Sequence, residues 1–247
     1  MDFETAEVSL LGDRETNQDR ATIVANDSGL LLAVADGMGG HAGGAEAAAM
    51  AIKTVVDAFR HCPQPIEDPE TFLESVVLAS HRAVVALGDG LPFEERPRTT
   101  LVACVVMDDV AHWCHVGDSR LYHFRGTELE FRTRDHSHVE LLFQQGKIKE
   151  EEMLTHPYRH FVESCLGGDP ARPWISVETD RQLEEGDSLL LCSDGMWTPY
   201  EDSGLAEFLG GSADLQLAMD ALAAKAVEVC GPQADNTTGV AFRLMAD

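Results

Sequence analysis

The stretch LLLAVADGM at residues 30–38 guides the interpretation of the whole chain, because LLLCSDGM at residues 189–196 repeats its form. Each is a continuous apolar run, typical of a strand buried on both faces, and each continues into Asp-Gly. The carboxylates of Asp36 and Asp194 are therefore expected at strand ends, where glycine lets the backbone turn sharply near a ligand. Asp-Gly alone is ordinary turn chemistry, but the glycine-rich continuation at 39–44 opens a helix and favours a binding role.

A third carboxylate, Asp235, comes shortly before the strand-like run 239–244. In an antiparallel sheet, the end of one strand and the start of its neighbour lie at the same edge, so Asp36, Asp194 and Asp235 can converge. Closely spaced carboxylates repel one another in a low dielectric and ionise together only with cations between them. Oxygen ligands without His or Cys favour Mg²⁺ or Mn²⁺, so the sequence predicts a site for these ions.

The remaining chain predicts antiparallel sheets covered by helices. Three segments carry one apolar stripe at helical spacing, namely 45–60, 70–87 and 215–230. Short strand-like runs are joined by tight turns, which indicates antiparallel pairing; they lie at 21–26, 30–35, 99–107, 110–116, 121–125, 176–179, 188–192 and 239–244. Helices do not alternate strictly with strands, so a doubly wound sheet is not expected. The predicted class is α+β.

The chain shows no sign of division into several domains. Its 247 residues contain no linker-like tract and no repeat, so we expect one domain spanning 1–247. Segment 137–173 nevertheless stands apart. Ser137-x-x-Glu140 is a capping-box pattern that predicts a short helix ending before Gly146, and several prolines follow. We expect a surface excursion beside the main body.

The charge balance excludes several classes of partner. With 18 basic and 43 acidic residues the formal net charge is −25, which disfavours nucleic acid and anionic lipid. The sequence shows no apolar run long enough to cross a bilayer and no basic start of a secretory signal. The six cysteines form no CxxC pair and are expected to be reduced. These features together predict a cytoplasmic protein without a membrane partner.

At this point the ordered motifs resemble a known family, the metal-dependent Ser/Thr protein phosphatases of type 2C, especially the compact bacterial members. The matching stretches, in order, are Arg14-x-x-Asn17-Gln18-Asp19, Ala35-Asp36-Gly37-Met38-Gly39-Gly40-His41, Thr99-Thr100-Leu101, Val116-Gly117-Asp118-Ser119-Arg120, Thr133-Arg134-Asp135-His136-Ser137, Cys192-Ser193-Asp194-Gly195 and Asp235-Asn236-Thr237-Thr238. Each stretch alone is weak evidence, whereas the ordered set is highly specific and covers nearly the whole chain.

The resemblance implies a four-layer αββα sandwich, in which helices flank two central antiparallel sheets. It also implies two Mn²⁺ or Mg²⁺ ions, with a third in bacterial relatives. Asp36 would bridge the first two ions, Asp194 and Asp235 would hold one of them, and the backbone carbonyl of Gly37 would hold the other. Asp118 would belong to the third site.

The resemblance further implies the reaction. Asp19 would contact metal-bound water and Arg14 would grip the phosphate, while segment 137–173 would form a flap beside the active site. Water shared by the ions would attack phosphorus directly, without a phospho-enzyme. Substrates would be phosphoserine and phosphothreonine proteins, and the partner would be a Ser/Thr kinase system of the same cell.

The sequence departs from the family pattern at three places. Pro97-Arg98 stands where glycine is frequent. Met38 occupies a place where some relatives carry a His that acts as general acid, which leaves His41 or water as the proton source. Thr198 stands where some relatives carry an acid that helps to hold the third metal.

Two other functions remain open from the sequence. One is a non-catalytic module that keeps the fold and reads a phosphorylated partner. The other is a metallohydrolase acting on a small phosphorylated metabolite or a nucleotide.

Overall fold

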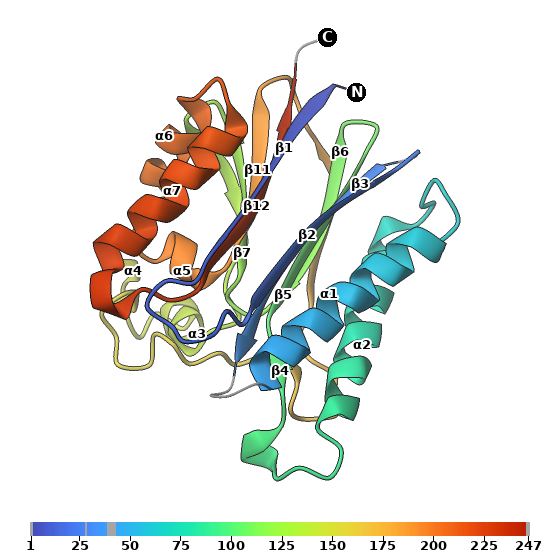
Figure 1. The fold of residues 1–247 in the computed structure, drawn as a ribbon, viewed down its shortest axis with the longest axis vertical. Coiled ribbons are helices and arrows are strands. Elements are labelled where there is room, and N and C mark those ends of the chain that lie inside the picture. The colour runs from blue at the N-terminus through green and yellow to red at the C-terminus, as the bar shows by residue number, and fades with distance from the viewer. Residues whose placement is uncertain (1, 28, 39–42, 246–247) are drawn as a thin grey trace.

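The structure is a computed structural model that describes residues 2–27, 29–38 and 43–245. Two antiparallel sheets face each other and helices cover the outer face of each, giving the order helix, sheet, sheet, helix (Figure 1). The predicted α+β sandwich is therefore confirmed. Among the described residues, no helix is both long and apolar enough to cross a bilayer.

The first sheet has five strands and carries the C-terminal helices. Its strand order is β1 (Phe3–Leu10), β12 (Thr237–Leu244), β11 (Asp187–Cys192), β7 (Arg120–Arg125) and β8 (Glu128–Arg132). The helices on the same side of the sandwich are α5 (Asp194–Trp197), α6 (Asp202–Gly210) and α7 (Leu215–Cys230). An apolar core that includes Met219 and Leu222 of α7 joins these helices to the sheet.

The second sheet has seven strands and carries the two long N-terminal helices. Its path runs through β10 (Ser176–Gln182), β6 (Val110–Val116), β5 (Leu101–Met107), β3 (Gly29–Met38), β4 (Arg98–Thr99) and β9 (Leu166–Gly167), and β2 (Asp19–Asn26) pairs with β3. The outer face is covered by α1 (Gly43–His61) and α2 (Pro69–Leu87). Two short 3₁₀ helices, at Phe93–Glu95 and Gly231–Gln233, complete the connections.

The unbroken apolar run of β3 follows from its position between two cores. Leu31, Ala33 and Ala35 belong to the core beneath α1 and α2, whereas alternate residues such as Leu32 and Val34 belong to the core between the sheets. Successive side chains of a strand point to opposite faces, so a strand covered on both sides must be apolar throughout.

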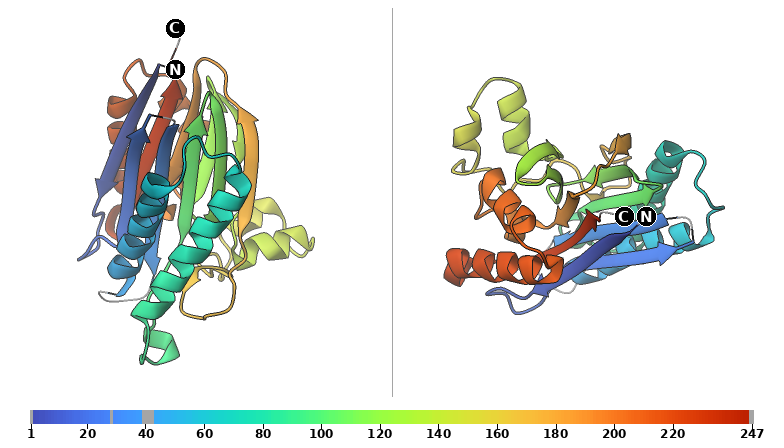
Figure 2. Two further views of the ribbon diagram at one scale, coloured as in Figure 1. Left: turned by 90° about the vertical axis from the view of Figure 1, so that its right-hand side faces the viewer. Right: turned by 90° about the horizontal axis from the view of Figure 1, so that it is seen from above.

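Several predicted elements match the structure closely. The expected helix 215–230 coincides with α7, and the other two long helices differ from expectation by at most two residues at either end. Only half of the predicted capping box is shown: the Ser137 hydroxyl accepts from the Glu140 amide, whereas the Glu140 carboxylate accepts from Arg134 and Gln144. The predicted helix is present as α3 (His138–Gln144), which ends before Gly146. Segment 137–173 also contains α4 (Glu150–Met153), and its helices α3 and α4 project from one end of the sandwich (Figure 2), whereas its residues Leu166–Gly167 form β9 of the seven-stranded sheet.

Other predicted boundaries were wrong. The expected strand 99–107 is interrupted at Thr100, because this residue forms two hydrogen bonds with the Asp36 backbone. The Thr100 amide donates to the Asp36 carbonyl and the Thr100 hydroxyl accepts from the Asp36 amide, at 2.9 Å each. The expected strand 176–179 continues to Gln182 after an irregularity in its pairing with β6. Strands β1 and β8 and helix α6 were not predicted. Both strands lie at sheet edges and are partly exposed, which gives them a weaker apolar signal.

Candidate active site

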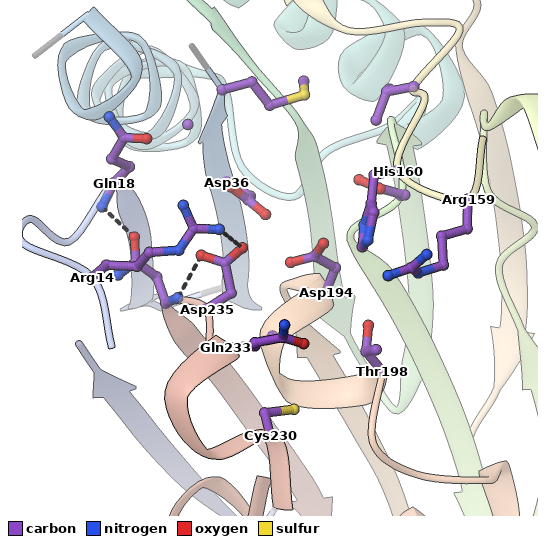
Figure 3. A pocket seen from close by; sticks show the side chains of 16 residues that line it. Arg14, Gln18, Asp36, Arg159, His160, Asp194, Thr198, Cys230, Gln233 and Asp235 are labelled. Atoms are coloured by element: carbon purple, nitrogen blue, oxygen red, sulfur yellow. Dashed lines mark hydrogen bonds and ion pairs between the residues drawn. The ribbon is translucent and has the colours of Figure 1, made fainter. Parts of the chain in front are cut away.

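A pocket of about 620 Å³ lies where strand ends from both sheets meet. Asp36 enters it from β3, Asp194 from the start of α5, and Asp235 from the turn before β12 (Figure 3). The predicted convergence of these three carboxylates is therefore confirmed. Their roles as metal ligands remain predictions.

Strand pairing brings the acids together. Asp19 starts β2 and lies directly opposite Asp36 in the antiparallel register with β3. Strands β11 and β12 are antiparallel neighbours, so Asp194, just after the end of β11, lies beside Asp235, just before β12. The Asp36 backbone is fixed on both sides: its amide donates to the Thr100 hydroxyl, and its carbonyl accepts from the Thr100 amide and the Thr99 hydroxyl, all at 2.9 Å.

Burial and mutual repulsion raise the pKa values of these carboxyls. The pKa of Asp19 rises from 3.8 to about 7 and that of Asp194 to about 6, in both cases mainly through desolvation. Desolvation also raises the pKa of Asp36 well above its usual range, with further contributions from the charges of the surrounding acids, first of all Asp19. The pKa of Asp118 is raised in the same way, with Asp194 as the main charge. The cluster therefore needs positive charge to ionise fully at neutral pH.

Unsatisfied carboxylate oxygens show where that charge fits. The Oδ2 atom of Asp19 accepts a hydrogen bond from the Ser193 hydroxyl at 2.7 Å, but its Oδ1 atom and the Oδ1 atom of Asp194 are buried without a hydrogen-bond partner in the structure. Buried polar atoms are normally paired. The donor set consists of oxygen atoms, which suits Mg²⁺ or Mn²⁺.

The cluster is not a closed cage. Among the described residues, no three His, Cys, Asp or Glu side chains are already arranged around one ion position. A hard divalent cation such as Mg²⁺ can keep several of its waters and bind through one or two carboxylates, and the oxygen donors of the cluster are of that kind. The residues present thus fit the ions that the sequence predicts.

Arg14 lines the pocket but is engaged by one of the acids. Its Nη2 atom donates to Oδ2 of Asp235 at 2.5 Å, and the two side chains are 56% and 36% exposed. The other carboxylate oxygen of Asp235 accepts from the backbone amide of Asn236 at 2.8 Å. Asp235 is thus neutralised by Arg14, whereas Asp194 has an oxygen without a partner.

Gly37 is required by close backbone packing. A Cβ atom at this position would lie 2.2 Å from the carbonyl oxygen of Gly44 and 2.8 Å from that of Gln18, so no other residue fits without displacement. Gly37 and Met38 both line the pocket, while the action of the Gly37 carbonyl as a ligand stays a prediction. His41 lies outside the described residues.

Asp118 lies between the main pocket and a smaller one. It is 8% exposed, and the Trp197 indole donates to its backbone carbonyl at 3.0 Å. Thr198 follows on the same turn and lines both pockets together with Asp118 and Asp194. Thr198, where the sequence departs from the family pattern, therefore lies beside the predicted third metal site.

The structure adds pocket residues that the sequence analysis did not identify. Arg159, His160 and Val162 reach the pocket from segment 137–173, although no local pattern singled them out. Ser193 and Asn236 were quoted only as motif neighbours of the acids. Asn236 accepts from the Gln18 amide and donates to the Leu11 carbonyl, both at 2.8 Å, and so ties the loop before β2 to the start of β12.

Comparison with known proteins identifies the family. Residues 9–215 match the family model described as protein phosphatase 2C. The chain is 34% identical over 212 residues to the serine/threonine protein phosphatase PstP of Mycobacterium tuberculosis, covering 83% of this chain but only 40% of that protein. It is 30% identical over 231 residues to the serine/threonine phosphatase stp of Listeria monocytogenes, covering 91% and 89% of the two chains.

Solved structures agree with this assignment. The crystal structure of M. tuberculosis PstP superposes with a TM-score of 0.84 at 32% identity and covers 99% of both chains. The PstP catalytic domain has also been solved in complex with two manganese ions, and that structure gives a TM-score of 0.81 at 30% identity over 99% of both chains. The predicted family is thereby confirmed, and the chain belongs to the protein phosphatase 2C family.

Proposed function

We propose that this chain is a Mn²⁺- or Mg²⁺-dependent protein phosphatase that hydrolyses phosphoserine and phosphothreonine. The observation that carries the proposal is the convergence of Asp19, Asp36, Asp118 and Asp194, whose pKa values are all raised. Relatives named serine/threonine phosphatases support the reaction, and the two manganese ions in PstP support the cofactor.

Each acid has a distinct task in this proposal. Asp36 would bridge two ions, Asp194 and Asp235 would complete one of the two positions, and the Gly37 carbonyl would complete the other. Asp118 would contribute to a third. When bound, the ions balance the carboxylate charge and lower the pKa of water, so that hydroxide is available near neutral pH.

Protein groups would orient the attacking water and the phosphate. Asp19 is held by the hydrogen bond from Ser193, and one of its oxygens has no partner in the structure. That oxygen can accept a proton from a water molecule, and Asp19 can thereby hold the water in line with phosphorus. Arg14 can present its planar fork to two phosphoryl oxygens once it leaves Asp235.

The pocket offers no good covalent nucleophile or strong side-chain acid among its described residues. Cys230 lines the pocket, but burial and the nearby charges of Asp194 and Asp235 raise its pKa, which lowers the thiolate fraction. Burial lowers the pKa of His160, so its charged form is scarce at neutral pH. Water would then supply the nucleophile, and the proton for the leaving serine or threonine would come from water or from His41, which lies outside the described residues.

We also propose a cellular setting for this chemistry. Proteins phosphorylated by a Ser/Thr kinase of the same cell would be the substrates, and the enzyme would reverse that kinase's signalling in the cytoplasm. Comparing the phosphoproteome of cells with and without the active enzyme would identify these substrates. An unchanged set of phosphoserine and phosphothreonine sites would contradict this setting.

The test compares Asp36→Asn with wild type in Mn²⁺-dependent phosphate release from phosphothreonine peptides. We expect a loss of at least about 100-fold, because the variant removes the charge that would bridge two ions. Asp57→Asn is the matched control, because the Asp57 side chain on α1 is 47% exposed and forms an ion pair only with Lys53 among the described residues. Equal activity of Asp36→Asn and wild type would refute the proposal.

A substrate panel separates the remaining alternatives. Faster hydrolysis of nucleotides or sugar phosphates than of phosphopeptides would indicate a small-molecule phosphatase. Binding of Mn²⁺ without turnover of phosphopeptides or aryl phosphates would indicate a non-catalytic binding module.

A further inference from the structure

A second, smaller pocket opens beside the proposed catalytic pocket. It measures about 140 Å³, and we call it the annex. Four residues labelled in Figure 3, namely Arg159, His160, Asp194 and Thr198, line both the annex and the main pocket, as does Asp118. In Figure 3 the Arg159 side chain, which comes from segment 137–173, points toward Asp194 and Thr198. The two pockets are therefore adjacent and share these side chains.

The other walls of the annex are largely apolar. Val139 of α3, Met153 of α4 and the adjacent Leu154 come from segment 137–173, and Trp197 of α5 comes from the sandwich. Leu154 is 55% exposed, so a bound group could bury much of its side chain. The annex thus has an apolar side, opposite in character to the charged and polar residues that it shares with the main pocket.

The remaining charged groups of the annex satisfy each other. Arg120 donates two hydrogen bonds to Asp135, both at 2.8 Å, and its guanidinium stacks over the Trp197 ring at 3.4 Å. Both members of this ion pair are less than a tenth exposed. The pair therefore closes one wall and offers little to a polar ligand.

We propose that the annex binds an apolar side chain of the substrate, two positions away from the phosphorylated residue; this inference rests on the proposed phosphatase function. In an extended peptide, residues two apart project from the same face, about 7 Å from each other. A phosphoresidue in the main pocket would thus place its second neighbour over the annex. A cavity of about 150 Å³ accepts benzene, so the annex has room for a leucine or methionine side chain.

Leu154 and Met153 are the residues assigned to specificity. Burying a leucine side chain of the substrate against them instead of a serine should raise kcat/KM by about 5–20-fold. The gain should arise mainly in KM, because these contacts are distant from the reacting phosphorus.

The experiment measures kcat/KM for phosphothreonine peptides that differ only at the second position before or after the phosphoresidue. Leu, Ser, Asp and Arg are compared at each position. Leu154→Ser should reduce the preference for Leu over Ser to less than about 3-fold and leave hydrolysis of a small aryl phosphate unchanged. Leu217→Ser is the matched control, since Leu217 is a 65% exposed leucine on α7 outside the annex.

The outcomes are distinguishable. A preference for Leu that disappears in Leu154→Ser and persists in Leu217→Ser supports the inference. Equal rates with all four residues, or a preference for Arg directed by the acids, overturns it while leaving the phosphatase function intact. Failure to hydrolyse any phosphopeptide, with small phosphates still cleaved, overturns both the inference and the protein substrate on which it rests.

Discussion

Replacing Asp19 by Asn should stabilise the metal-free protein at alkaline pH. The carboxyl is 3% exposed, one of its oxygens is unsatisfied, and its pKa is raised from 3.8 to about 7. Desolvation is the main cause, while the charges of Asp194 and Asp235 add to it. Without metal ions, ionising Asp19 in the folded state therefore costs free energy that the unfolded chain does not have to supply.

The sign of the pH dependence follows from the raised pKa. Between pH 3.8 and about 7 the folded protein holds the Asp19 proton more tightly than the unfolded chain does, so stability falls as pH rises through this window. The difference between the pKa of Asp19 in the unfolded chain and in the folded protein corresponds to about 4 kcal/mol of stability, at 1.36 kcal/mol per pKa unit. Because neighbouring carboxyls titrate together with Asp19, we expect about 2–4 kcal/mol.

Urea unfolding in excess chelator, at a series of pH values from about 5 to about 8, measures the effect. Asp19→Asn should be more stable than wild type by about 2–4 kcal/mol near pH 8 and by much less near pH 5, where Asp19 is protonated. Mn²⁺ should stabilise wild type most at high pH. A variant that is equally or less stable than wild type near pH 8 would refute the account of the acidic cluster.

Two further substitutions test neighbouring interactions. Arg14→Gln should bind Mn²⁺ about 2–5-fold more tightly in calorimetry without substrate, because an exposed ion pair with Asp235 no longer competes; unchanged or weaker binding would contradict this. Arg120→Met should lower the free energy of unfolding by about 3–5 kcal/mol in urea, because it leaves the buried Asp135 unpaired. Adding Asp135→Leu should recover part of that loss, and no recovery would show that the Arg120 packing, not its charge, matters.

The site could be predicted from sequence where local pattern and chemistry coincide. The apolar runs leading to Asp36 and Asp194 indicate buried strands, and a buried strand end with a carboxylate and glycine is a strong local signal. The prediction that Asp235 joins them required one more step, namely the assumption that the strands around it pair in antiparallel fashion. The long helices were predictable from their apolar stripes; the structure adds that Asp68 and Asp214, which the sequence analysis did not identify as caps, accept hydrogen bonds from backbone amides in the first turns of α2 and α7.

The contribution of segment 137–173 could not be predicted in this way. Arg159 and His160 carry no spacing that indicates a site, and they reach the pocket only because the segment folds back toward it. The Arg14–Asp235 pair is similar, since 221 positions separate the two residues. Side chains that meet through tertiary packing alone leave no periodic trace in the sequence.

The distribution of charge suggests an order of events at the active site. A protein with a net charge of −25 repels a phosphate dianion, and Arg14, which is expected to receive that dianion, is paired with Asp235. Divalent cations would reverse the local field and compete with Arg14 for Asp235, which would release the guanidinium. One binding event would thus remove the repulsion and free the phosphate ligand, so metal loading should precede productive substrate binding. The annex shares Asp118 and Asp194 with the main pocket, so metal loading would change the charge of its acidic wall, whereas its apolar wall of Val139, Met153, Leu154 and Trp197 would keep the same chemistry.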